Sequence, residues 1–304
     1  MELERRRFLG SLVAGGAGLL VAAPAAASIP GQIEHHRLAV DHPDLHGRRL
    51  VHLTDLHLSD EQSERRIRQA LRIVNRLRPD LVLLTGDYVN WGTTHIEPLA
   101  ELLSYLRAPR VAILGNHDHY AGGDLMTAAL EARGTRVLRN ASAVLPIGAA
   151  RLRLIGIDDR RTGHEDVAAA VAGVGDDEEL CLALVHNPAA ADDLPPGLAH
   201  LILAGHTHGG QIDIRGLTRW VVRMVGSGYV RGFYDTPGGR LYVNRGWGTV
   251  GMPMRVGAAA EIAVFHLDYT PGRGLPRGGR TTRTSSASAP SRVDTAAVTR
   301  HRRG

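Results

Sequence analysis

The stretch LILAGHTHGGQI, residues 201–212, decides the fold predicted for this chain. A short apolar run leads into Gly205, and two histidines two positions apart, His206 and His208, are followed at once by two glycines. This pattern is typical of a buried strand that ends in a tight turn, where side chains two apart in an extended segment point to the same side. The glycines let the backbone bend close to whatever the imidazoles bind. Because neutral histidine is the commonest transition-metal ligand, the stretch predicts part of a metal site.

The composition indicates one large α/β domain, or two small ones, between basic ends. The chain has 304 residues, of which 43% are hydrophobic, 22% charged and 4% aromatic, so it can bury a sizeable and mainly aliphatic core. The formal net charge is +5, but residues 1–27 carry three Arg against two Glu and residues 271–304 carry eight Arg against one Asp, which leaves about −3 for the middle. A basic nucleic-acid groove is therefore not expected in the folded body, and nucleic acid is an unlikely partner.

The N-terminal segment, residues 1–27, resembles a twin-arginine export signal. Arg5-Arg6-Arg7 precedes Phe8-Leu9, a Gly- and Ala-rich apolar stretch follows, and Ala25-Ala26-Ala27 offers a cleavage site. A membrane anchor is less favoured, because spanning a bilayer takes about 20 strongly apolar residues and this stretch contains several glycines and a proline. We therefore expect export by the twin-arginine translocation machinery and an extracytoplasmic location at the cell wall or membrane, with retention of the uncleaved segment as the main alternative.

The C-terminal segment, residues 271–304, is rich in Gly, Pro, Ser, Thr, Ala and Arg and predicts a disordered basic tail. Such a tail could hold the protein to an anionic cell-wall or membrane surface by screened charge attraction, or could simply be solvated. The folded domain is accordingly expected at residues 28–270.

Strands and helices are predicted to alternate in the first half of this domain. Apolar runs predict strands over residues 48–58, 81–84 and 111–114, and amphipathic spacing predicts helices over 64–78, 95–106 and near 124–132. Alternation with short connections indicates parallel βαβ units, which bind ligands at the carboxyl ends of their strands. The second half predicts a short helix at 167–171 and strands at 136–138, 143–147, 151–157, 180–185, 201–204, 241–243 and 261–267.

Eight polar residues lie at or just after the carboxyl ends of five of these predicted strands: Asp55, His57, Asp87, Asn116, His117, His186, His206 and His208. Any one alone has an ordinary explanation as a turn residue or a hydrogen-bonded core histidine. Carboxylates buried near one another are costly, however, unless cations turn their repulsion into attraction. The mixed carboxylate, amide and imidazole set suits Mn²⁺, Fe or Zn²⁺ better than Ca²⁺ or a thiolate site.

Five short segments of this chain resemble, in order, the five motifs of the calcineurin-like metallophosphoesterases. They are Asp55-Leu56-His57, Gly86-Asp87, Gly115-Asn116-His117-Asp118, His186 and Gly205-His206-Thr207-His208. The resemblance covers residues from about 48 to 267. Later residues are similar to a narrower branch of exported bacterial phosphodiesterases related to UDP-2,3-diacylglucosamine pyrophosphatases: Gly209-Gly210-Gln211-Ile212, Gly228-Tyr229 and Gly232-Phe233-Tyr234. The resemblance implies an α/β fold with four layers, an αββα sandwich of two mixed β-sheets flanked by helices.

The same resemblance assigns roles to the matched positions. It implies that Asp55, His57 and His208 hold one divalent metal, that Asn116, His186 and His206 hold a second, and that Asp87 bridges them. His117 would be the general acid beside the phosphate, oriented by Asp118. A hydroxide shared by the two metals would attack phosphorus in line while His117 protonates the leaving group. The implied substrate is a phosphodiester or pyrophosphate, such as a cell-envelope diester or a nucleotide-linked lipid, and manganese or iron ranks ahead of zinc.

Two other functions fit parts of the sequence. A metal-dependent nuclease could use the same motifs, but it would need a basic, aromatic-lined groove. A non-catalytic metal-binding envelope protein is the second alternative, although none of the eight positions is missing. For the substrate, the residues that either line a pocket or pack the second sheet are Tyr229, Arg231, Phe233, Tyr234, Trp247 and Arg255.

Overall fold

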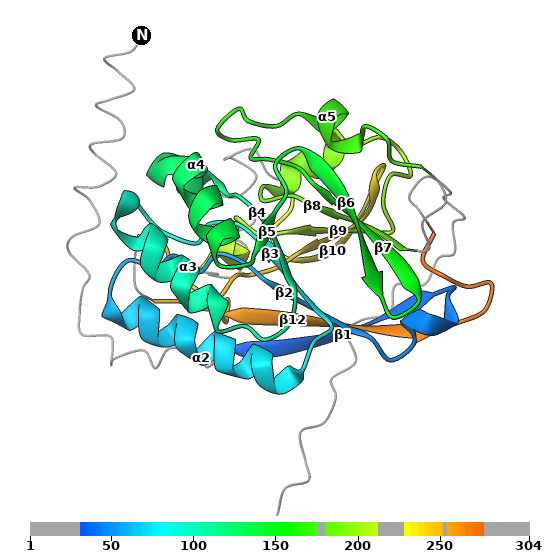
Figure 1. Ribbon diagram of the computed structural model, residues 1–304, viewed down its shortest axis with the longest axis horizontal. Helices are drawn as coiled ribbons and strands as arrows, with labels where there is room; N and C mark the ends of the chain where they lie inside the picture. Colours follow the sequence, from blue (N-terminus) through cyan, green and yellow to red (C-terminus); the bar gives the residue numbers. More distant parts are fainter. Residues whose placement is uncertain (1–30, 176–179, 212–227, 252–253, 277–304) are drawn as a thin grey trace, which may run out of the picture.

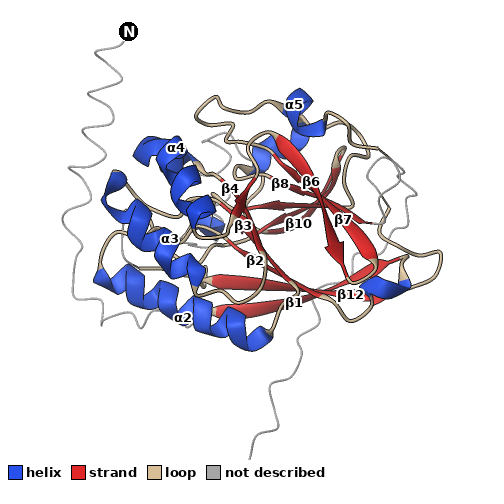
Figure 2. Cartoon of the chain, viewed as in Figure 1, coloured by secondary structure: helices blue, strands red, loops and turns tan. Residues whose placement is uncertain are grey.

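Two mixed β-sheets pack face to face in the computed structural model, which describes residues 31–175, 180–211, 228–251 and 254–276 (Figures 1 and 2). The predicted export signal, residues 1–27, and residues 277–304 of the predicted tail lie outside these described ranges. Every helix within them is too short or too polar to span a bilayer. The expected αββα sandwich is confirmed by this arrangement of layers.

The first sheet has the strand order β1-β12-β2-β3-β4-β5. Only the pairing of β12 with β2 is antiparallel. Its strands are β1 (Gln32–Val40), β2 (Arg49–Leu53), β3 (Leu81–Thr85), β4 (Arg110–Ile113), β5 (Arg136–Val137) and β12 (Glu261–Tyr269). The helices α2 (Glu61–Leu77), α3 (Ile96–Ser104) and α4 (Asn116–Ala132) lie together on its outer side (Figure 2).

The second sheet has the order β10-β11-β9-β8-β7-β6, with antiparallel strands at both edges. Its strands are β6 (Ala141–Ile147), β7 (Ala150–Gly156), β8 (Leu180–Leu184), β9 (Leu201–Ala204), β10 (Gly232–Thr236) and β11 (Gly239–Val243). The helix α5 (Val167–Val171) and the 3-10 helix η3 (Pro188–Asp192) pack on its outer face, and further 3-10 turns are η1 (Pro43–Leu45), η2 (Thr93–His95) and η4 (His208–Gly210).

The strands are apolar on both faces because each sheet is covered on both sides. In β3, Leu81 and Leu83 point into the core between the sheets, whereas Val82 and Leu84 pack under the helices. This is the continuous apolar run expected of a parallel strand buried on both faces. Each fully buried Leu or Val contributes about 1.5–3 kcal/mol relative to an exposed one. Burial on both faces therefore stabilises the parallel strands, and the strands hold the loops at their carboxyl ends in place.

Helix α2 begins at a well-formed cap. The carboxylate of Asp60 accepts the backbone N–H of Ser63 at 2.7 Å, and the Ser63 hydroxyl accepts the N–H of Asp60 at 2.9 Å. This reciprocal capping box satisfies donors that the first helical turn leaves free. Residues Ile67, Leu71 and Val74 then face the sheet.

Three elements differ from the sequence-based expectation. The edge strands β1 and β10 carry too many polar and half-exposed residues to show a strand signal. Helix α4 begins at Asn116, eight residues before the predicted start, and Gly122 interrupts it with φ 126°. Residues 271–276 run beside β1, where Leu275 N–H donates to Ala39 O at 2.9 Å.

Candidate metal centre

The predicted ligands meet at one edge of the sandwich, where parallel strands of both sheets end. Asp55 and His57 follow β2, Asp87 follows β3, and Asn116 opens α4 directly after β4. From the other sheet, His186 follows β8, and His206 and His208 follow β9. Six of the seven are 5% exposed or less, and His206 is half-buried. Such burial of polar side chains is costly unless each is paired or binds a cation.

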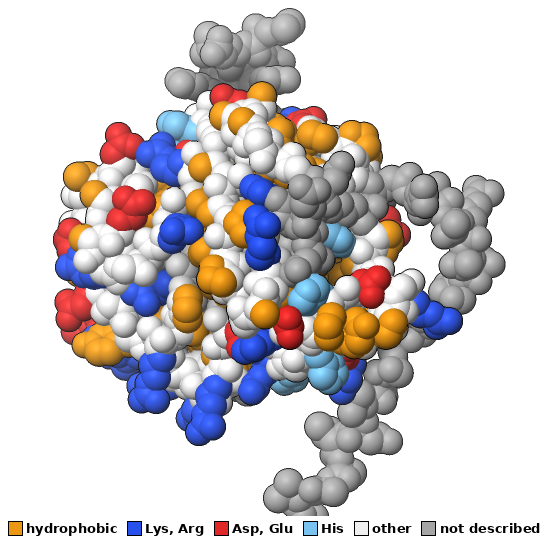
Figure 3. All heavy atoms as spheres, turned by 45° about the vertical axis from the view of Figure 1, so that its right-hand side comes forward, with side chains coloured by type: hydrophobic (Ala, Val, Ile, Leu, Met, Phe, Trp, Pro, Cys, Tyr) orange, Lys and Arg blue, Asp and Glu red, His pale blue; other side chains and the backbone are white. Residues whose placement is uncertain are grey.

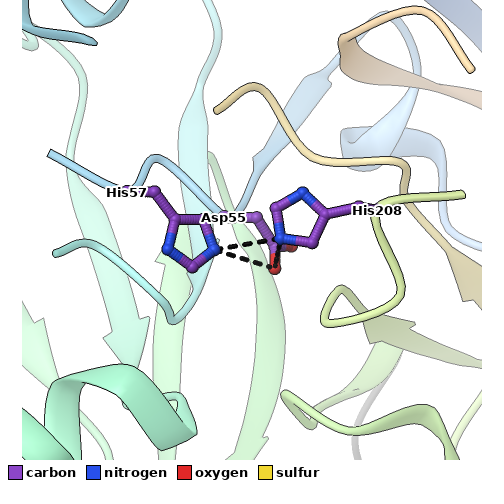
Figure 4. Close-up of side chains that lie close together, drawn as sticks. All are labelled: Asp55, His57 and His208. Carbon is purple, nitrogen blue, oxygen red and sulfur yellow. Dashed lines mark hydrogen bonds and ion pairs between the residues drawn. The ribbon is translucent and has the colours of Figure 1, made fainter. Parts of the chain in front are cut away.

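The first cluster contains Asp55, His57 and His208, whose side chains converge in Figure 4. The Nε2 atoms of the two histidines lie 3.0 Å apart, and Asp55 Oδ1 lies 3.4 Å from His208 Nε2 and 3.9 Å from His57 Nε2. Burial lowers the pKa of His57 to about 4, so its imidazole is neutral at pH 7. Two neutral imidazoles and a carboxylate thus point at one small space, which is a ligand set for a transition metal.

The second cluster contains Asp87, His186 and His206. Asp87 Oδ2 lies 3.1 Å from His186 Nε2, which in turn lies 3.2 Å from His206 Nδ1. The same Asp87 oxygen lies 3.6 Å from His57 Nε2 of the first cluster. The Asp87 carboxylate therefore lies between the two clusters, in the position from which one ligand can reach a metal in each of them.

In the second cluster, the pKa shifts of Asp87 and His186 show that the Asp87 carboxylate needs a positive charge beside it. Burial works against ionisation of Asp87, but the adjacent His186 outweighs it and holds the pKa of Asp87 below its usual range. Burial likewise opposes protonation of His186, yet the charge of Asp87 raises the pKa of His186 to about 10. A proton thus supplies the positive charge opposite Asp87 in the bare chain, and a divalent cation can take its place.

Asn116 provides an independent test of the metal assignment. Its Oδ1 atom is buried and has no hydrogen-bond donor among the residues that the structure describes. A buried amide oxygen without a partner costs about 1–3 kcal/mol, and a cation satisfies it. The ligand chemistry of the residues present therefore fits a pair of divalent metals.

The loops that carry these ligands have an unusual backbone. Asp55, His57, Asp87, His206 and His208 all have φ between 48° and 71°. This left-handed region is uncommon for residues other than glycine, and such residues cluster at functional sites. The expectation of an extended backbone around His206 and His208 is therefore wrong, and the two side chains belong to different clusters.

Two glycines allow the loops to approach the ligands closely. A Cβ on Gly205 would lie 2.3 Å from Asp55 Oδ2, and a Cβ on Gly115 would lie 2.3 Å from Asp87 Oδ1. No side chain fits at either position without displacing a candidate ligand.

Asp118 does not contact the side chain of His117, contrary to the role expected for it. Its carboxylate instead accepts the backbone N–H groups of Asp87 at 2.8 Å, Tyr88 at 2.8 Å and Gly115 at 2.9 Å. Burial, reinforced by the charge of Asp87, raises the pKa of Asp118 to about 7. Asp118 thus fixes the two loops that present Asp87 and Asn116.

His117 is held by a main-chain group. Its Nδ1 atom lies 2.7 Å from the carbonyl oxygen of Asn90, and this contact fixes Nδ1 as the donor. The ring lies beside the first cluster, with its centroid 5.0 Å from that of His57. The Nε2 atom is therefore the one left to exchange a proton.

Arg255, expected to line a substrate pocket, is only 7% exposed, and its guanidinium forms hydrogen bonds inside the protein instead. Its guanidinium donates to the carbonyl oxygen of His208 at 3.2 Å and to Gly248 O at 2.9 Å. It therefore fixes the loop that carries His208.

Four of the remaining predicted pocket residues lie on or near β10 and make contacts within the fold, whereas Trp247 packs under the helices of the first sheet. Tyr229 donates to Asp192 at 2.5 Å, Tyr234 accepts from Val230 N–H at 3.0 Å, and Arg231 donates to Gly257 O at 3.3 Å. Phe233 packs against Tyr242, and Trp247, 5% exposed, donates to Arg66 O at 2.8 Å.

Sequence reasoning missed three residues around His117. The carbonyl of Asn90 has no sequence signal, because every residue has one. Trp91 and Tyr120 carry aromatic rings whose centroids lie 4.9 and 5.9 Å from that of His117. The available clue in the sequence was that Trp91 lies four residues after Asp87 and Tyr120 lies two residues after Asp118.

Known proteins are similar to this chain over most of its length. Residues 48–210 match the calcineurin-like phosphoesterase family. The uncharacterized metallophosphoesterase YkuE of Bacillus subtilis (strain 168) is 33% identical over 74% of this chain and 80% of its own. An uncharacterized metallophosphoesterase of Aquifex aeolicus (strain VF5) is 29% identical over 72% and 84%, and phosphodiesterase YaeI of Escherichia coli (strain K12) is 29% identical over 78% and 89%.

Proposed function

The chain belongs to the calcineurin-like phosphoesterase family, and from this premise we propose that it is a phosphodiesterase or pyrophosphatase that works with two divalent metals. The observation that carries the proposal is the position of Asp87 Oδ2, within 3.6 Å of a histidine in each cluster. The buried Asn116 oxygen, which has no hydrogen-bond donor among the described residues, supports it as well. A relative named phosphodiesterase favours a diester as substrate.

The residues that would hold the metals are those of the two clusters. Asp55, His57 and His208 would hold one, Asn116, His186 and His206 the other, and Asp87 both. Two such cations supply a water of lowered pKa and neutralise charge on the phosphoryl oxygens. Manganese or iron ranks ahead of zinc in this proposal, since the mixed oxygen and nitrogen ligands suit all three.

The protein's own contribution to the chemistry is proton transfer and orientation. Because Nδ1 of His117 donates to Asn90 O, a protonated His117 presents Nε2–H to a leaving-group oxygen. Positioned general acids of this kind contribute about 10²–10⁴-fold to rate. Asp118 and Arg255 keep the ligand loops in place by hydrogen bonds to the backbone. Low exposure of the clusters excludes bulk water, which strengthens these interactions.

A cell-envelope diester or a pyrophosphate-linked lipid is the proposed substrate class, and the proposed route to it is export by the twin-arginine machinery. The support is the Arg5-Arg6-Arg7 segment, because export of a folded chain suits a protein that acquires its metals inside the cell. Replacing these three arginines by lysine should stop secretion. Unchanged secretion would contradict the proposed route.

The alternative of a nuclease lacks support from the face of the molecule that Figure 3 shows. The face in Figure 3 carries basic and acidic side chains side by side, with scattered hydrophobic ones. A continuous basic surface would be needed to follow a nucleic-acid backbone. The alternative of a non-catalytic metal-binding protein predicts bound ions without turnover, and the following experiment separates it.

The decisive experiment compares bis-p-nitrophenyl phosphate with p-nitrophenyl phosphate, using metal-stripped protein to which Mn²⁺, Zn²⁺, Mg²⁺ or Ca²⁺ is added back. Cleavage of the diester restored by Mn²⁺, with little cleavage of the monoester, is the expected result. Faster cleavage of the monoester would overturn the diesterase assignment. Two bound ions with no turnover of either ester would favour the non-catalytic alternative.

A further inference from the structure

Two large aromatic side chains lie exposed and stacked on each other at the edge of the metal centre. Trp91 is 64% exposed and Tyr120 47%, and their rings are nearly parallel, with centroids 5.5 Å apart and an interplanar angle of 9°. Single exposed apolar residues are ordinary on protein surfaces, whereas adjoining ones often mark a binding site. This pair forms an apolar stack whose outer faces are covered by water unless a ligand covers them.

The position of the pair is set by the same elements that hold His117. Trp91 directly follows Asn90, whose carbonyl accepts the Nδ1 proton of His117. Tyr120 lies three residues after His117 in α4, on the same side of the helix. The His117 ring meets both aromatic rings edge to face, at 67° and 72°. His117 therefore lies between the first metal cluster and the aromatic pair.

We propose that Trp91 and Tyr120 form a platform that binds a flat ring in the leaving group of the substrate. The inference rests on the proposed function and narrows its substrate class to phosphodiesters with an aryl or nucleoside leaving group. A general acid must reach the leaving oxygen within hydrogen-bond distance, so the leaving group lies on the His117 side of phosphorus. A flat ring there can extend the Trp91–Tyr120 stack on an outer face, since aromatic rings bind one another by stacking.

Methyl p-nitrophenyl phosphate tests the platform directly, because its only ring belongs to the leaving group. With Mn²⁺-loaded protein, Trp91→Ala should lower kcat/KM about tenfold for this ester and by a similar factor for bis-p-nitrophenyl phosphate. Trp91→Phe should retain most of the activity and Trp91→Leu should resemble Trp91→Ala. The matched control is Leu125→Ala on α4, the helix that carries Tyr120, since Leu125 is also exposed, at 57%, and should change nothing.

A binding measurement gives a readout that does not depend on turnover. Phenylphosphonate should bind the Mn²⁺-loaded wild type more tightly than methylphosphonate in calorimetry, and Trp91→Ala should remove this preference without weakening methylphosphonate. Because both aromatic residues are exposed, the circular dichroism and melting temperature of the variants should match the wild type.

Several results would overturn the inference. One is unchanged kcat/KM and unchanged phenyl preference in Trp91→Ala. A second is a loss confined to the bis ester, which would put the ring of the non-leaving group on the platform. A third is full activity of Trp91→Leu, which would indicate a general apolar surface. If the wild type cleaves neither ester with any metal, the proposed function fails, and the calorimetric comparison still decides the platform.

Discussion

Replacing Asp118 by Asn should destabilise the loops of the metal centre. The Asp118 carboxylate accepts three buried backbone N–H groups, two at Oδ2 and one at Oδ1. An asparagine keeps only one side-chain oxygen. With that oxygen at the Oδ2 position, it still accepts from Asp87 and Gly115, but its NH₂ group then faces the N–H of Tyr88. One unsatisfied buried donor costs about 1–3 kcal/mol. Asp118→Ala leaves all three donors unsatisfied and should cost about 3–9 kcal/mol, a large part of the about 5–15 kcal/mol that stabilises a typical domain.

Urea unfolding at pH 8 measures this effect with the carboxylate ionised. Burial and the charge of Asp87 raise the pKa of Asp118 to about 7, so ionisation is unfavourable in the fold and partly offsets the cost of the lost hydrogen bond at this pH. Asp118→Asn should lower the unfolding midpoint without changing the slope and should also reduce the manganese content, since Asp118 holds Asp87. The matched control is Asp124→Asn on the same helix. The Asp124 side chain is 94% exposed and forms a surface ion pair with Arg139, so this change should shift stability by at most about 1 kcal/mol. Wild-type stability and metal content in Asp118→Asn would refute the reasoning.

Three further changes test other parts of the structure. His117→Asn should keep both metals and lose about 10²–10⁴-fold on diesters with poor leaving groups but little on p-nitrophenyl esters; equal slowing of both would contradict an acid role. Gly205→Ala places a carbon 2.3 Å from Asp55 Oδ2 and should remove metal and activity together, which metal analysis checks. Asp60→Ala should lower the free energy of unfolding by about 1 kcal/mol at pH 7. The hydrogen bond from the backbone N–H of Ser63 is the main cause of the lowered pKa of Asp60. The difference in stability between the wild type and Asp60→Ala should therefore vanish as the pH falls through that pKa. A difference that stays constant in acid would contradict the role of Asp60 as a cap.

That the candidate ligands lie close together could be predicted from the sequence because the topology of the sheets largely determines it. Parallel strands end at one edge, so polar residues such as Asp87 and His186 that follow buried strands must lie close together. The apolar runs were easy to recognise, since both sheets are covered on both faces. The same rule could not foresee the left-handed backbone of His206 and His208, because φ angles depend on the loops packed against them.

Other features leave no mark in the residue pattern. The group that holds His117 is a backbone carbonyl, and Asn90 supplies it only because of where the chain passes. The role expected for Asp118 failed for a related reason: a carboxylate adjacent in sequence points toward three backbone donors instead of the imidazole. Strand β1 was missed because pairing with β12, in register from Gln32–Glu261 to Val40–Tyr269, holds it in place with few apolar side chains.

The candidate ligands come from both sheets, and this has a consequence for how the protein matures. His57 and His208 meet although 151 positions separate them, so neither metal position is complete until the second sheet has formed and docked on the first. A nascent chain that ends before β9 has only part of each ligand set. Cations that bind only the finished structure stabilise it by mass action and give nothing to partly folded chains. Metal loading is therefore expected only after folding is complete, and ions bound there would add a link between the two sheets at this edge.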